Sequence, residues 1–425
     1  MLTIQKVERI EGRISVPGDK SISHRAVMLL GISRGSGKID GFLPGEDCLG
    51  TIRCLRQLGV EIEQHDSVVV VHGRGRRGLT KPEGVLDVGN SGTTMRLMAG
   101  ILAGQDFACT VTGDASLLTR PMDRIAVPLR LMGADIGGTG DNDSPPLRIQ
   151  GKSLKAIDYI LPVASAQVKS AILLAGLYAD GETTVRETVP ARNHTECMLE
   201  YLGAQISMSD GQTTVRKSDL EARDIHVPGD ISSAAFFIAA AAALPGSHLI
   251  IENVGLNPTR TGIIDVLRDM GADIAIENLV LDHGEARGDL IVRGKALHGT
   301  TVSSEMIPRL IDEIPVLAVI AGLAEGQTRI LGAGELRVKE SNRIASLVSE
   351  LSKLGMTIRE LPDGLEIEGP SCVRGAVVES YGDHRMAMAL AVAGLFAQET
   401  VKVRDSRCIN VSFPGFEHTL QSIVN

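Results

Sequence analysis

One sequence pattern occurs six times, in altered form, along the 425 residues of this chain. The stretch ISVPGDKSISHRAVMLLG around Pro17 comes back as IHVPGDISSAAFFIAAAAAL around Pro228. In each copy an extended apolar piece runs into a turn of Gly, Pro, Ser or Asp and then into an apolar helix. A repeat that covers the whole chain restricts the fold to an assembly of similar units. The copies align on Pro17, Gly89, Pro162, Pro228, Pro308 and Gly382.

A second marker divides each unit further. Leu-Gly or Met-Gly, followed by alternating strand residues as in LGVEIE and MGADIG, begins at residues 58, 132, 202, 270 and 354. Glycine at this place favours the left-handed backbone that ends a helix, and the alternation indicates a strand. Each unit therefore predicts the order βαβαββ, an α/β arrangement.

The apolar helices predict how the units are grouped. A helix that is apolar on all sides, such as the one expected over 232–244, must be surrounded by other elements. Three units per domain give two domains of ordinary size, 17–227 and 228–425, with the restart of VPGD as the boundary. We expect the strand within residues 1–16 to join the second domain, and a cleft between the two.

Composition and charge exclude several classes of protein. The net charge of −9 argues against binding to nucleic acid or to a membrane surface. The sequence has no Trp and only 3% aromatic residues, which disfavours base stacking. The longest apolar stretch is too short for a membrane span, and the start lacks a signal peptide. Six cysteines without metal-ligand spacing indicate free thiols, so we expect a cytoplasmic protein without a metal site.

Lysine and arginine gather where the repeated helices begin. Helix N-termini bind anions through free N–H groups. A single arginine of this kind more often serves a solvated surface, but several clusters beside the repeated turns favour a substrate rich in phosphate and carboxylate. The helix starts carry Lys20 with Arg25, Arg96, Lys169 and Arg385, and further basic residues lie in LLTRPMDR, PARNH and RVKESNR.

The same motifs carry a family resemblance over essentially the whole chain. PGDKSISHR, GNSGTTMRL, RPMDR, RVKESNR and YGDHRMAM, in this order, resemble the 5-enolpyruvylshikimate-3-phosphate synthases. The resemblance implies two domains of three βαβαββ repeats with the helices inside (an inside-out α/β barrel) and an active site in the interdomain cleft. It implies transfer of the enolpyruvyl group of phosphoenolpyruvate to the 5-hydroxyl of shikimate 3-phosphate, in the shikimate pathway to chorismate and aromatic amino acids. Phosphate is released, and no metal or organic cofactor is implied.

The resemblance assigns shikimate 3-phosphate mainly to the first domain. Ala166 stands where the family has a serine, so only a backbone contact carries over there. From the residues alone, Ser21 is equally compatible with a helix N-cap, and Gln167 with a solvated polar side chain. The ligands implied are Lys20, Ser21, Arg25, Ser165, Ala166, Gln167, Arg192, Asp312 and Lys339.

Phosphoenolpyruvate is assigned to groups from both domains. Planar guanidinium groups suit a ligand that bears a carboxylate and a phosphate. Gly92 either leaves space for that ligand or serves only the backbone turn. The family's phosphonate inhibitor, glyphosate, would occupy the same place. The ligands implied are Lys20, Asn90, Gly92, Arg120, Gln167, Arg343 and Arg385.

Asp312, Glu340 and Lys20 are the implied catalytic residues. Asp312 would accept the proton of the 5-hydroxyl, and Glu340 or Lys20 would protonate the methylene carbon. From the residues alone, Asp312 is also a helix-start carboxylate, and Glu340 is also half of an i,i+3 ion pair with Arg343. The second domain would thus be the catalytic and phosphoenolpyruvate-binding one.

One position departs from the family, and two other functions stay open. Some members carry a lysine before the C-terminal FP, where this sequence has Val411. The sister transferase, which acts on UDP-N-acetylglucosamine in cell-wall synthesis, uses a loop cysteine, whereas Cys109 falls on an expected strand. A non-catalytic anion-binding module is the third alternative. We expect a monomer whose partners are the two small-molecule substrates.

Overall fold

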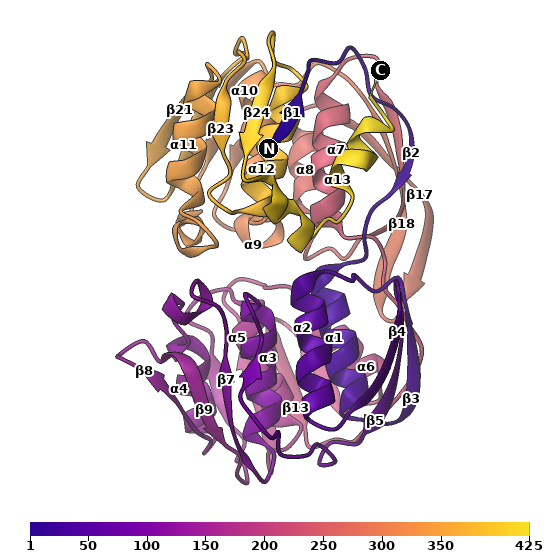
Figure 1. Ribbon diagram of the computed structural model, residues 1–425, viewed down its shortest axis with the longest axis vertical. Helices are drawn as coiled ribbons and strands as arrows, with labels where there is room; N and C mark the ends of the chain where they lie inside the picture. Colours follow the sequence, from indigo (N-terminus) through magenta and orange to yellow (C-terminus); the bar gives the residue numbers. More distant parts are fainter. Residues whose placement is uncertain (425) are drawn as a thin grey trace. The chain divides into compact units, whose positions relative to one another are not determined.

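The computed structural model describes residues 1–424, and their strands form six separate sheets. These residues divide into two units, which Figure 1 draws with element labels. The first unit comprises Gly18–Val227 and the short turn Leu281–Glu285. The second comprises Met1–Pro17, Pro228–Val280 and the described chain from Ala286 onward. No helix among these residues is long and apolar enough to cross a membrane.

The first unit contains six α-helices and three of the sheets among its described residues. Its elements in chain order are α1 (Lys20–Gly31), β3 (Ser33–Asp40), α2 (Glu46–Gln57), β4 (Glu61–His65), β5 (Val68–Arg74), β6 (Leu86–Asp87), α3 (Gly92–Ala103), β7 (Ala108–Thr112), the 3-10 helix η1 (Leu117–Thr119), α4 (Asp123–Leu131), β8 (Asp135–Thr139), β9 (Ser144–Gln150), β10 (Asp158–Ile160), α5 (Ala166–Gly176), β11 (Glu182–Arg186), α6 (His194–Tyr201), β12 (Ile206–Ser209), β13 (Gln212–Arg216), β14 (Leu220–Glu221) and β15 (Ile225–His226).

The second unit starts with two strands from the beginning of the sequence and continues after Val227. Its elements are β1 (Leu2–Ile4), β2 (Glu11–Ser15), α7 (Ile231–Ala243), β16 (His248–Gly255), α8 (Gly262–Asp269), β17 (Asp273–Asp282), β18 (Glu285–Arg293), β19 (Thr301–Val302), α9 (Ile307–Leu310), α10 (Ile314–Leu323), β20 (Gly326–Ile330), η2 (Gly334–Val338), α11 (Arg343–Lys353), β21 (Thr357–Leu361), β22 (Gly364–Gly369), β23 (Val377–Glu379), α12 (His384–Gly394), β24 (Val401–Arg404), η3 (Ser406–Val411) and α13 (Phe416–Gln421).

The predicted βαβαββ order is visible in the pairing of the strands. In the sheet β6-β7-β9-β8 the first two strands are parallel and flank helix α3 in sequence. After α4, strands β8 and β9 form an antiparallel hairpin, and β9 closes against β7. The sheets β10-β11-β13-β12 and β19-β20-β22-β21 repeat this arrangement.

Two repeats exchange their first strands. Strand β2 precedes α1 in sequence but pairs in parallel with β16, which follows α7. Conversely, β14 and β15 precede α7 but pair in parallel with β3, which follows α1. The local pattern of strand, helix and strand is therefore kept, while the partner of the first strand belongs to the other copy of the VPGD motif.

The sixth repeat is completed by the beginning of the sequence. Its sheet has the order β1-β24-β23, in which β23 and β24 are parallel and β1 is antiparallel to β24. In this sheet β1 takes the edge next to β24.

The five Leu-Gly and Met-Gly markers end helices as expected. Each of their glycines has a φ between +84° and +97°, a backbone conformation that residues with a side chain rarely adopt. In each case the next strand begins within four residues. The residues concerned are Gly59, Gly133, Gly203, Gly271 and Gly355.

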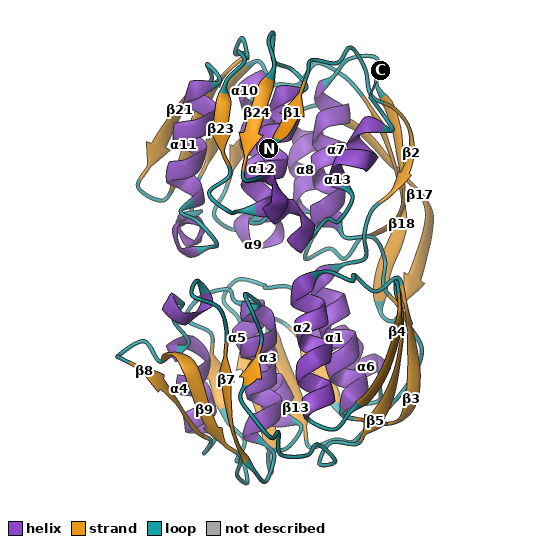
Figure 2. Cartoon of the chain, viewed as in Figure 1, coloured by secondary structure: helices purple, strands orange, loops and turns teal. Residues whose placement is uncertain are grey.

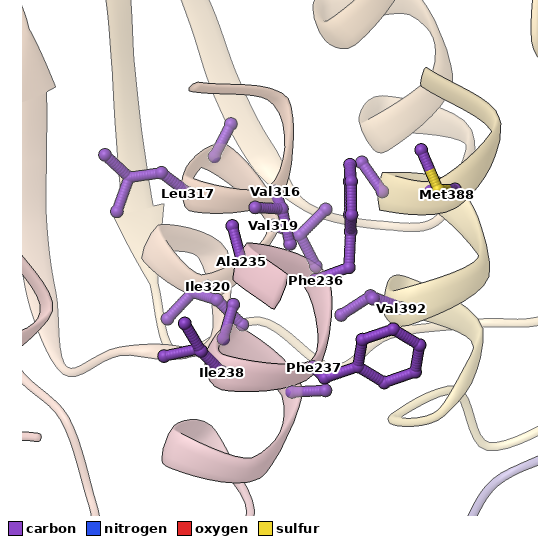
Figure 3. Close-up of a cluster of buried hydrophobic side chains, with 14 of the residues drawn as sticks. Ala235, Phe236, Phe237, Ile238, Val316, Leu317, Val319, Ile320, Met388 and Val392 are labelled. Carbon is purple, nitrogen blue, oxygen red and sulfur yellow. The ribbon is translucent and has the colours of Figure 1, made fainter. Parts of the chain in front are cut away.

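The apolar helices form the interior of each unit. In Figure 2 the helices of each unit are flanked by its strands. In the second unit α7, α10 and α12 are buried along nearly their whole length, and Figure 3 shows their side chains meeting, among them Phe236, Val316 and Met388. This arrangement confirms the predicted inside-out α/β fold. It also brings the N-termini of the central helices close together within each unit, where the polar motifs lie.

Candidate active site

The first motif starts helix α1 with a lysine held by a carboxylate. The side chain of Asp19 caps the helix, because its Oδ1 accepts a hydrogen bond from the backbone N of Ile22 at 2.9 Å. The Nζ of Lys20 forms an ion pair with Asp47, in the first turn of α2. Since Asp19 is the N-cap of α1, Ser21 is not the capping residue. The partly exposed side chain of Ser21 is therefore not needed to start the helix.

Arg25 lies one turn further along α1 and is almost fully buried, with 4% of its surface exposed. Its Nε donates to Thr195 Oγ1 at 2.7 Å, its Nη1 to the carbonyl of Ser21 at 2.9 Å and its Nη2 to Ser170 Oγ at 3.0 Å. Burial lowers the pKa of Arg25 to about 10, so that the guanidinium stays charged at neutral pH. The cation of the first motif is therefore held rigidly by α1, α5 and α6.

The start of α5 continues this line of polar groups. Ser165 caps the helix by accepting from the backbone N of Val168, and the carbonyl of Ala166 accepts from Ser170 Oγ at 2.6 Å. The amide of Gln167 is not merely solvated. Its Oε1 accepts from Arg96 Nη1 at 2.6 Å, and its Nε2 donates to Thr93 Oγ1 at 2.9 Å. Gln167 thus connects the starts of α5 and α3.

The GN-x-G turn before α3 positions Arg120. Asn90 donates from Nδ2 to Asp114 at 2.8 Å and accepts at Oδ1 from Arg120 Nη2 at 2.8 Å. Gly92 is the first residue of α3 and has no positive φ, so the backbone does not require glycine there. An added Cβ at Gly92 would lie 3.1 Å from Arg96 Nη1 and 3.4 Å from Arg120 Nη1. The missing side chain leaves room for two guanidinium groups.

A buried chain of hydrogen bonds lies beneath these helix starts. His24 Nδ1 contacts Thr51 Oγ1 at 2.7 Å, Thr51 contacts Thr94 Oγ1 at 2.7 Å, and Thr94 donates to Ser91 Oγ, the cap of α3, at 2.7 Å. Burial, together with the nearby cation of Lys20, lowers the pKa of His24 to about 3, so the imidazole is neutral at physiological pH. The chain fixes α1, α2 and α3 relative to one another.

Lys169 has a different role from the one its sequence position suggested. It is only 1% exposed, and its Nζ pairs with Glu187 at 2.8 Å and with Glu196 at 2.6 Å. The lysine is therefore a buried structural cation and not part of an anion-binding helix start. Its carboxylate partners flank the loop that carries Arg192, which is partly buried. Glu196 directly follows Thr195, the partner of Arg25.

In the second unit, Asp312 precedes α10 and faces two arginines. Its Oδ1 lies 3.5 Å from Arg343 Nη1 and 3.7 Å from Arg385 Nε, and its backbone carbonyl accepts from Arg385 Nη1 at 3.2 Å. The residue at the cap position of α10 is Glu313. Asp312 is therefore not the capping residue, and its carboxylate is placed between the guanidinium groups of α11 and α12.

Arg343 is fully buried and surrounded by carboxylates. It donates from Nε to Asp383 Oδ2 at 2.8 Å and from Nη2 to Glu340 Oε2 at 2.6 Å, in addition to its contact with Asp312. The i,i+3 pair between Glu340 and Arg343 that the spacing suggested is thus present. Burial alone would raise the pKa of the Glu340 and Asp383 carboxyls, but Arg343 lowers both below their usual range. Both groups are ionised.

The remaining predicted residues lie at the edges of this group. Lys339 is partly buried next to Glu340, and Val411 is the last residue of η3. Arg385 is 12% exposed at its side chain, compared with 0% for Arg343, which makes it the more accessible guanidinium. Among residues 1–424, one group of three side chains of a type that can bind a metal has its ligand atoms within 4.8 Å of one another. It consists of Glu61, Glu63 and His72, and none of them is a predicted site residue.

Sequence reasoning missed several partners of the predicted residues. Asp383 stood in the quoted motif YGDHRMAM, and Asp47 lies in the first turn of an amphipathic helix, but neither position reveals which cation it meets. Thr195 and Ser170, which hold Arg25, carry no signal in the sequence because their contacts span 170 and 145 residues.

Comparisons with known proteins match this chain to one family over nearly its whole length. A sequence model described as EPSP synthase (3-phosphoshikimate 1-carboxyvinyltransferase) matches residues 4–420. A 3-phosphoshikimate 1-carboxyvinyltransferase of Alkaliphilus metalliredigens is 61% identical over 424 residues, covering 100% of both chains. One from Desulforudis audaxviator is 54% identical and covers 99% of both. The solved EPSP synthase of Acinetobacter baumannii superposes with a TM-score of 0.90 at 44% identity, covering 99% of this chain and 97% of its own.

Proposed function

Because this chain belongs to the EPSP synthase family, we propose that it is the shikimate-pathway transferase that acts on shikimate 3-phosphate and phosphoenolpyruvate. It moves the enolpyruvyl group to the 5-hydroxyl of shikimate 3-phosphate and releases inorganic phosphate. Both substrates are small anions, in keeping with an acidic protein whose cations gather at helix starts.

The observation that carries the proposal is the continuous line of polar groups along the starts of α1, α5 and α3. It runs from Arg25 through Ser170 to the carbonyl of Ala166, and the next residue, Gln167, continues it through Arg96 to the start of α3 at Gly92. Helix N-termini and guanidinium groups together favour a ligand with a phosphate and a carboxylate. We assign shikimate 3-phosphate in the first unit to Lys20, Ser21, Arg25, Ser165, the backbone of Ala166, Gln167 and Arg192.

Phosphoenolpyruvate binds the cations next to those assigned to shikimate 3-phosphate. Arg120 is held in place by Asn90, and the guanidinium groups of Arg96 and Arg120 lie next to Gly92, which has no side chain to displace them. In the second unit, Arg385 is the accessible guanidinium, whereas Arg343 must exchange one of its carboxylate partners to bind an anion. We assign phosphoenolpyruvate to Lys20, Asn90, Gly92, Arg120, Gln167, Arg343 and Arg385, with no replacement for the lysine missing at Val411.

The mechanism is addition followed by elimination. Lys20 transfers a proton to the methylene carbon of phosphoenolpyruvate, or Glu340, ionised in the free chain, first takes up a proton and then relays it to that carbon. C2 becomes electrophilic. The 5-hydroxyl of shikimate 3-phosphate attacks C2 while Asp312 accepts its proton. The tetrahedral intermediate then expels phosphate as its C–O bond breaks, the methyl carbon returns a proton to the group that supplied it, and the C=C bond of the enol ether forms. Lys339 binds shikimate 3-phosphate on the side of the second unit. Arginines around the leaving phosphate stabilise its charge.

The other two functions are less well supported. The sister transferase for UDP-N-acetylglucosamine uses a loop cysteine, whereas Cys109 lies within strand β7 and burial raises the pKa of its thiol to about 11. A thiol of this kind is not a thiolate at neutral pH. A non-catalytic module would not need Asp312 and Glu340 next to the arginine pair.

Phosphate release tests the proposal. The purified chain is mixed with both substrates, with each alone, and with UDP-N-acetylglucosamine in place of shikimate 3-phosphate. We expect one phosphate per enolpyruvyl ether formed, only when both proposed substrates are present. Phosphate release from phosphoenolpyruvate with UDP-N-acetylglucosamine, and not with shikimate 3-phosphate, would favour the sister activity. Binding of shikimate 3-phosphate without any release would indicate an anion-binding module.

We further propose a cytoplasmic monomer that works without metal or organic cofactor. Sedimentation equilibrium should then give a single species near 45.1 kDa, and activity should survive dialysis against a chelator. A dimer, or activity that returns only on adding a divalent cation, would contradict this part.

A further inference from the structure

The second copy of the VPGD motif has kept the shape of the first and lost its cations. Asp230 caps α7 just as Asp19 caps α1. One residue later, however, Ile231 stands where the first copy has Lys20, and Phe236 stands where it has Arg25. The serine two residues after the capping aspartate, Ser232, is retained. The proposed function gives this serine no task.

Ser232 lies in a buried polar cluster of the second unit. Its hydroxyl donates to Glu313 Oε1 in a short hydrogen bond, and it accepts from Arg260 Nη2 at 2.8 Å. The same Nη2 also contacts Asp230 Oδ1 at 3.0 Å. Ser232 is 2% exposed, Arg260 2% and Glu313 0%. The cluster therefore connects the starts of α7 and α10 away from water.

The two partners of the Ser232 hydroxyl, Arg260 and Glu313, fix its orientation. A hydroxyl has one hydrogen to donate, and because a lone pair of Ser232 is taken by Arg260, the hydrogen points at Glu313. Ser232 is therefore one of the groups that hold the Glu313 carboxylate in position. Arg260 thus acts on Glu313 through Ser232.

Glu313 is next to the proposed phosphoenolpyruvate ligands. Its Oε1 lies 3.9 Å from Arg385 Nη1, too far for a hydrogen bond. The same Nη1 donates to the carbonyl of Asp312 at 3.2 Å. Glu313 and Arg385 thus form a loose ion pair, and a small displacement of the Glu313 carboxylate would tighten it into a hydrogen-bonded one. The same displacement would move the backbone that presents Asp312.

Burying four polar or charged side chains is costly, and an apolar cluster of the same volume is often at least as stable. We propose that Ser232 and Arg260 are positioning residues: they hold the Glu313 carboxylate back from Arg385, so that this guanidinium remains able to bind the anionic substrate. The inference rests on the proposed function, in which Arg385 binds phosphoenolpyruvate. The serine after the capping aspartate would thus bind a ligand in the first VPGD copy, as Ser21, and position a carboxylate in the second, as Ser232.

The critical experiment compares three variants in steady-state kinetics. In Ser232→Ala, Glu313 loses the hydrogen bond from this serine, and its carboxylate moves closer to Arg385. The KM for phosphoenolpyruvate should rise roughly tenfold or more, the effect of losing one charged hydrogen bond, while the dissociation constant of shikimate 3-phosphate is unchanged. In the double variant Ser232→Ala with Glu313→Gln there is no carboxylate to neutralise Arg385. The KM should then return most of the way to the wild-type value.

Ser233→Ala is the matched control, because Ser233 is the next residue of α7 and is also buried at 4% exposure. It should leave the KM unchanged. An unchanged KM in Ser232→Ala, or a double variant worse than both single ones, would overturn the proposal. If Ser232→Ala does not fold, Ser232→Cys with the same Glu313 change tests the same rescue. A wild-type chain without turnover would instead refute the proposed function.

Discussion

Asp383 binds Arg343 through both of its carboxylate oxygens, with Nε to Oδ2 at 2.8 Å and Nη2 to Oδ1 at 3.3 Å. The same Oδ1 accepts from the backbone N of Arg385 at 2.9 Å and caps α12. One carboxylate thus fixes the start of α12 and the first residue of α11. The two arginines assigned to phosphoenolpyruvate therefore have a common anchor, which limits how far either can move alone.

Asp312→Asn should lower kcat by roughly 10²-fold or more, because asparagine keeps the shape of the side chain and cannot accept the proton. The dissociation constant of shikimate 3-phosphate should change by no more than a few-fold. Single-turnover rates and equilibrium binding measure the two quantities. Asp265→Asn, which removes an ion pair with Arg309 in the same unit, is the control and should keep kcat. Normal turnover in Asp312→Asn would remove this residue from the mechanism.

Gly92→Ala should separate phosphoenolpyruvate from glyphosate. The backbone tolerates alanine at the first turn of α3, so the midpoint of thermal unfolding should stay within a few degrees. The new methyl presses on Arg96 and Arg120, and a longer ligand needs that space more. The inhibition constant of glyphosate should rise roughly 10- to 200-fold, and the KM for phosphoenolpyruvate less.

Gly137→Ala is the matched control for this comparison, since its added Cβ would lie 3.5 Å from Arg130 Nη2, an arginine outside the proposed site. It should alter neither constant. Equal proportional changes in both constants of Gly92→Ala would mean that Gly92 does not discriminate between the two ligands.

His24 should make the protein less stable as the pH falls. Its folded pKa of about 3 lies below the ordinary value of 6.5 because of burial. Between these values the unfolded chain binds a proton that the folded chain does not, so the free energy of unfolding decreases with decreasing pH. From pH 7 to pH 5 the loss from this one group is about 2 kcal/mol. Urea unfolding at both pH values should show it.

The comparison variant is His24→Gln, which has no titrating group in this range. It should be less stable than the wild type at pH 7 and should lose less stability on going to pH 5. Lys20, Arg25, Asp19 and Asp47 surround His24 and are present in both proteins, so the difference isolates the imidazole. Identical pH dependence in wild type and His24→Gln would contradict the prediction.

Lys169→Met should destabilise the first unit strongly. It leaves Glu187 and Glu196 buried without their cation, a change that typically costs about 3–5 kcal/mol. Lys217→Met removes an exposed ion pair with Asp180 and should cost less than about 1 kcal/mol. Chemical unfolding of both variants gives the comparison. Similar losses in the two would show that the buried triad contributes no more than a surface pair.

Local patterns were enough to predict the repeat. The glycines after Leu58 and Met132 end their helices with positive φ, and the apolar helices are buried, because both properties depend on neighbours in sequence. The exchange of first strands was not predictable. Strand β2 pairs with β16 and not with β3, although β3 is the strand that follows α1. The local pattern is the same around both strands, so it does not tell which of them β2 joins.

For the site, the sequence indicated which residues carry charge but not what each one meets. The pair between Glu340 and Arg343 follows from helical spacing and is present. Lys169 and Lys20 both lie near the start of a repeated helix, yet Lys169 is buried against two glutamates and Lys20 is partly exposed beside Asp47. Glu187 and Glu196 lie 18 and 27 residues away from Lys169, and only the folded chain brings them to it.

The pairing of β1 with β24, in which Leu2 lies opposite Val403, has a consequence for synthesis. The residues 18–227 of the first unit are continuous in sequence and leave the ribosome before almost all of the second. Strand β2, with its buried Ile14, must wait for β16, and β1 must wait for residue 401. For most of translation, nascent chains therefore carry an N-terminal segment whose two strands have not yet found their partners, and its buried positions, such as Ile14, stay exposed to water until the second unit is made.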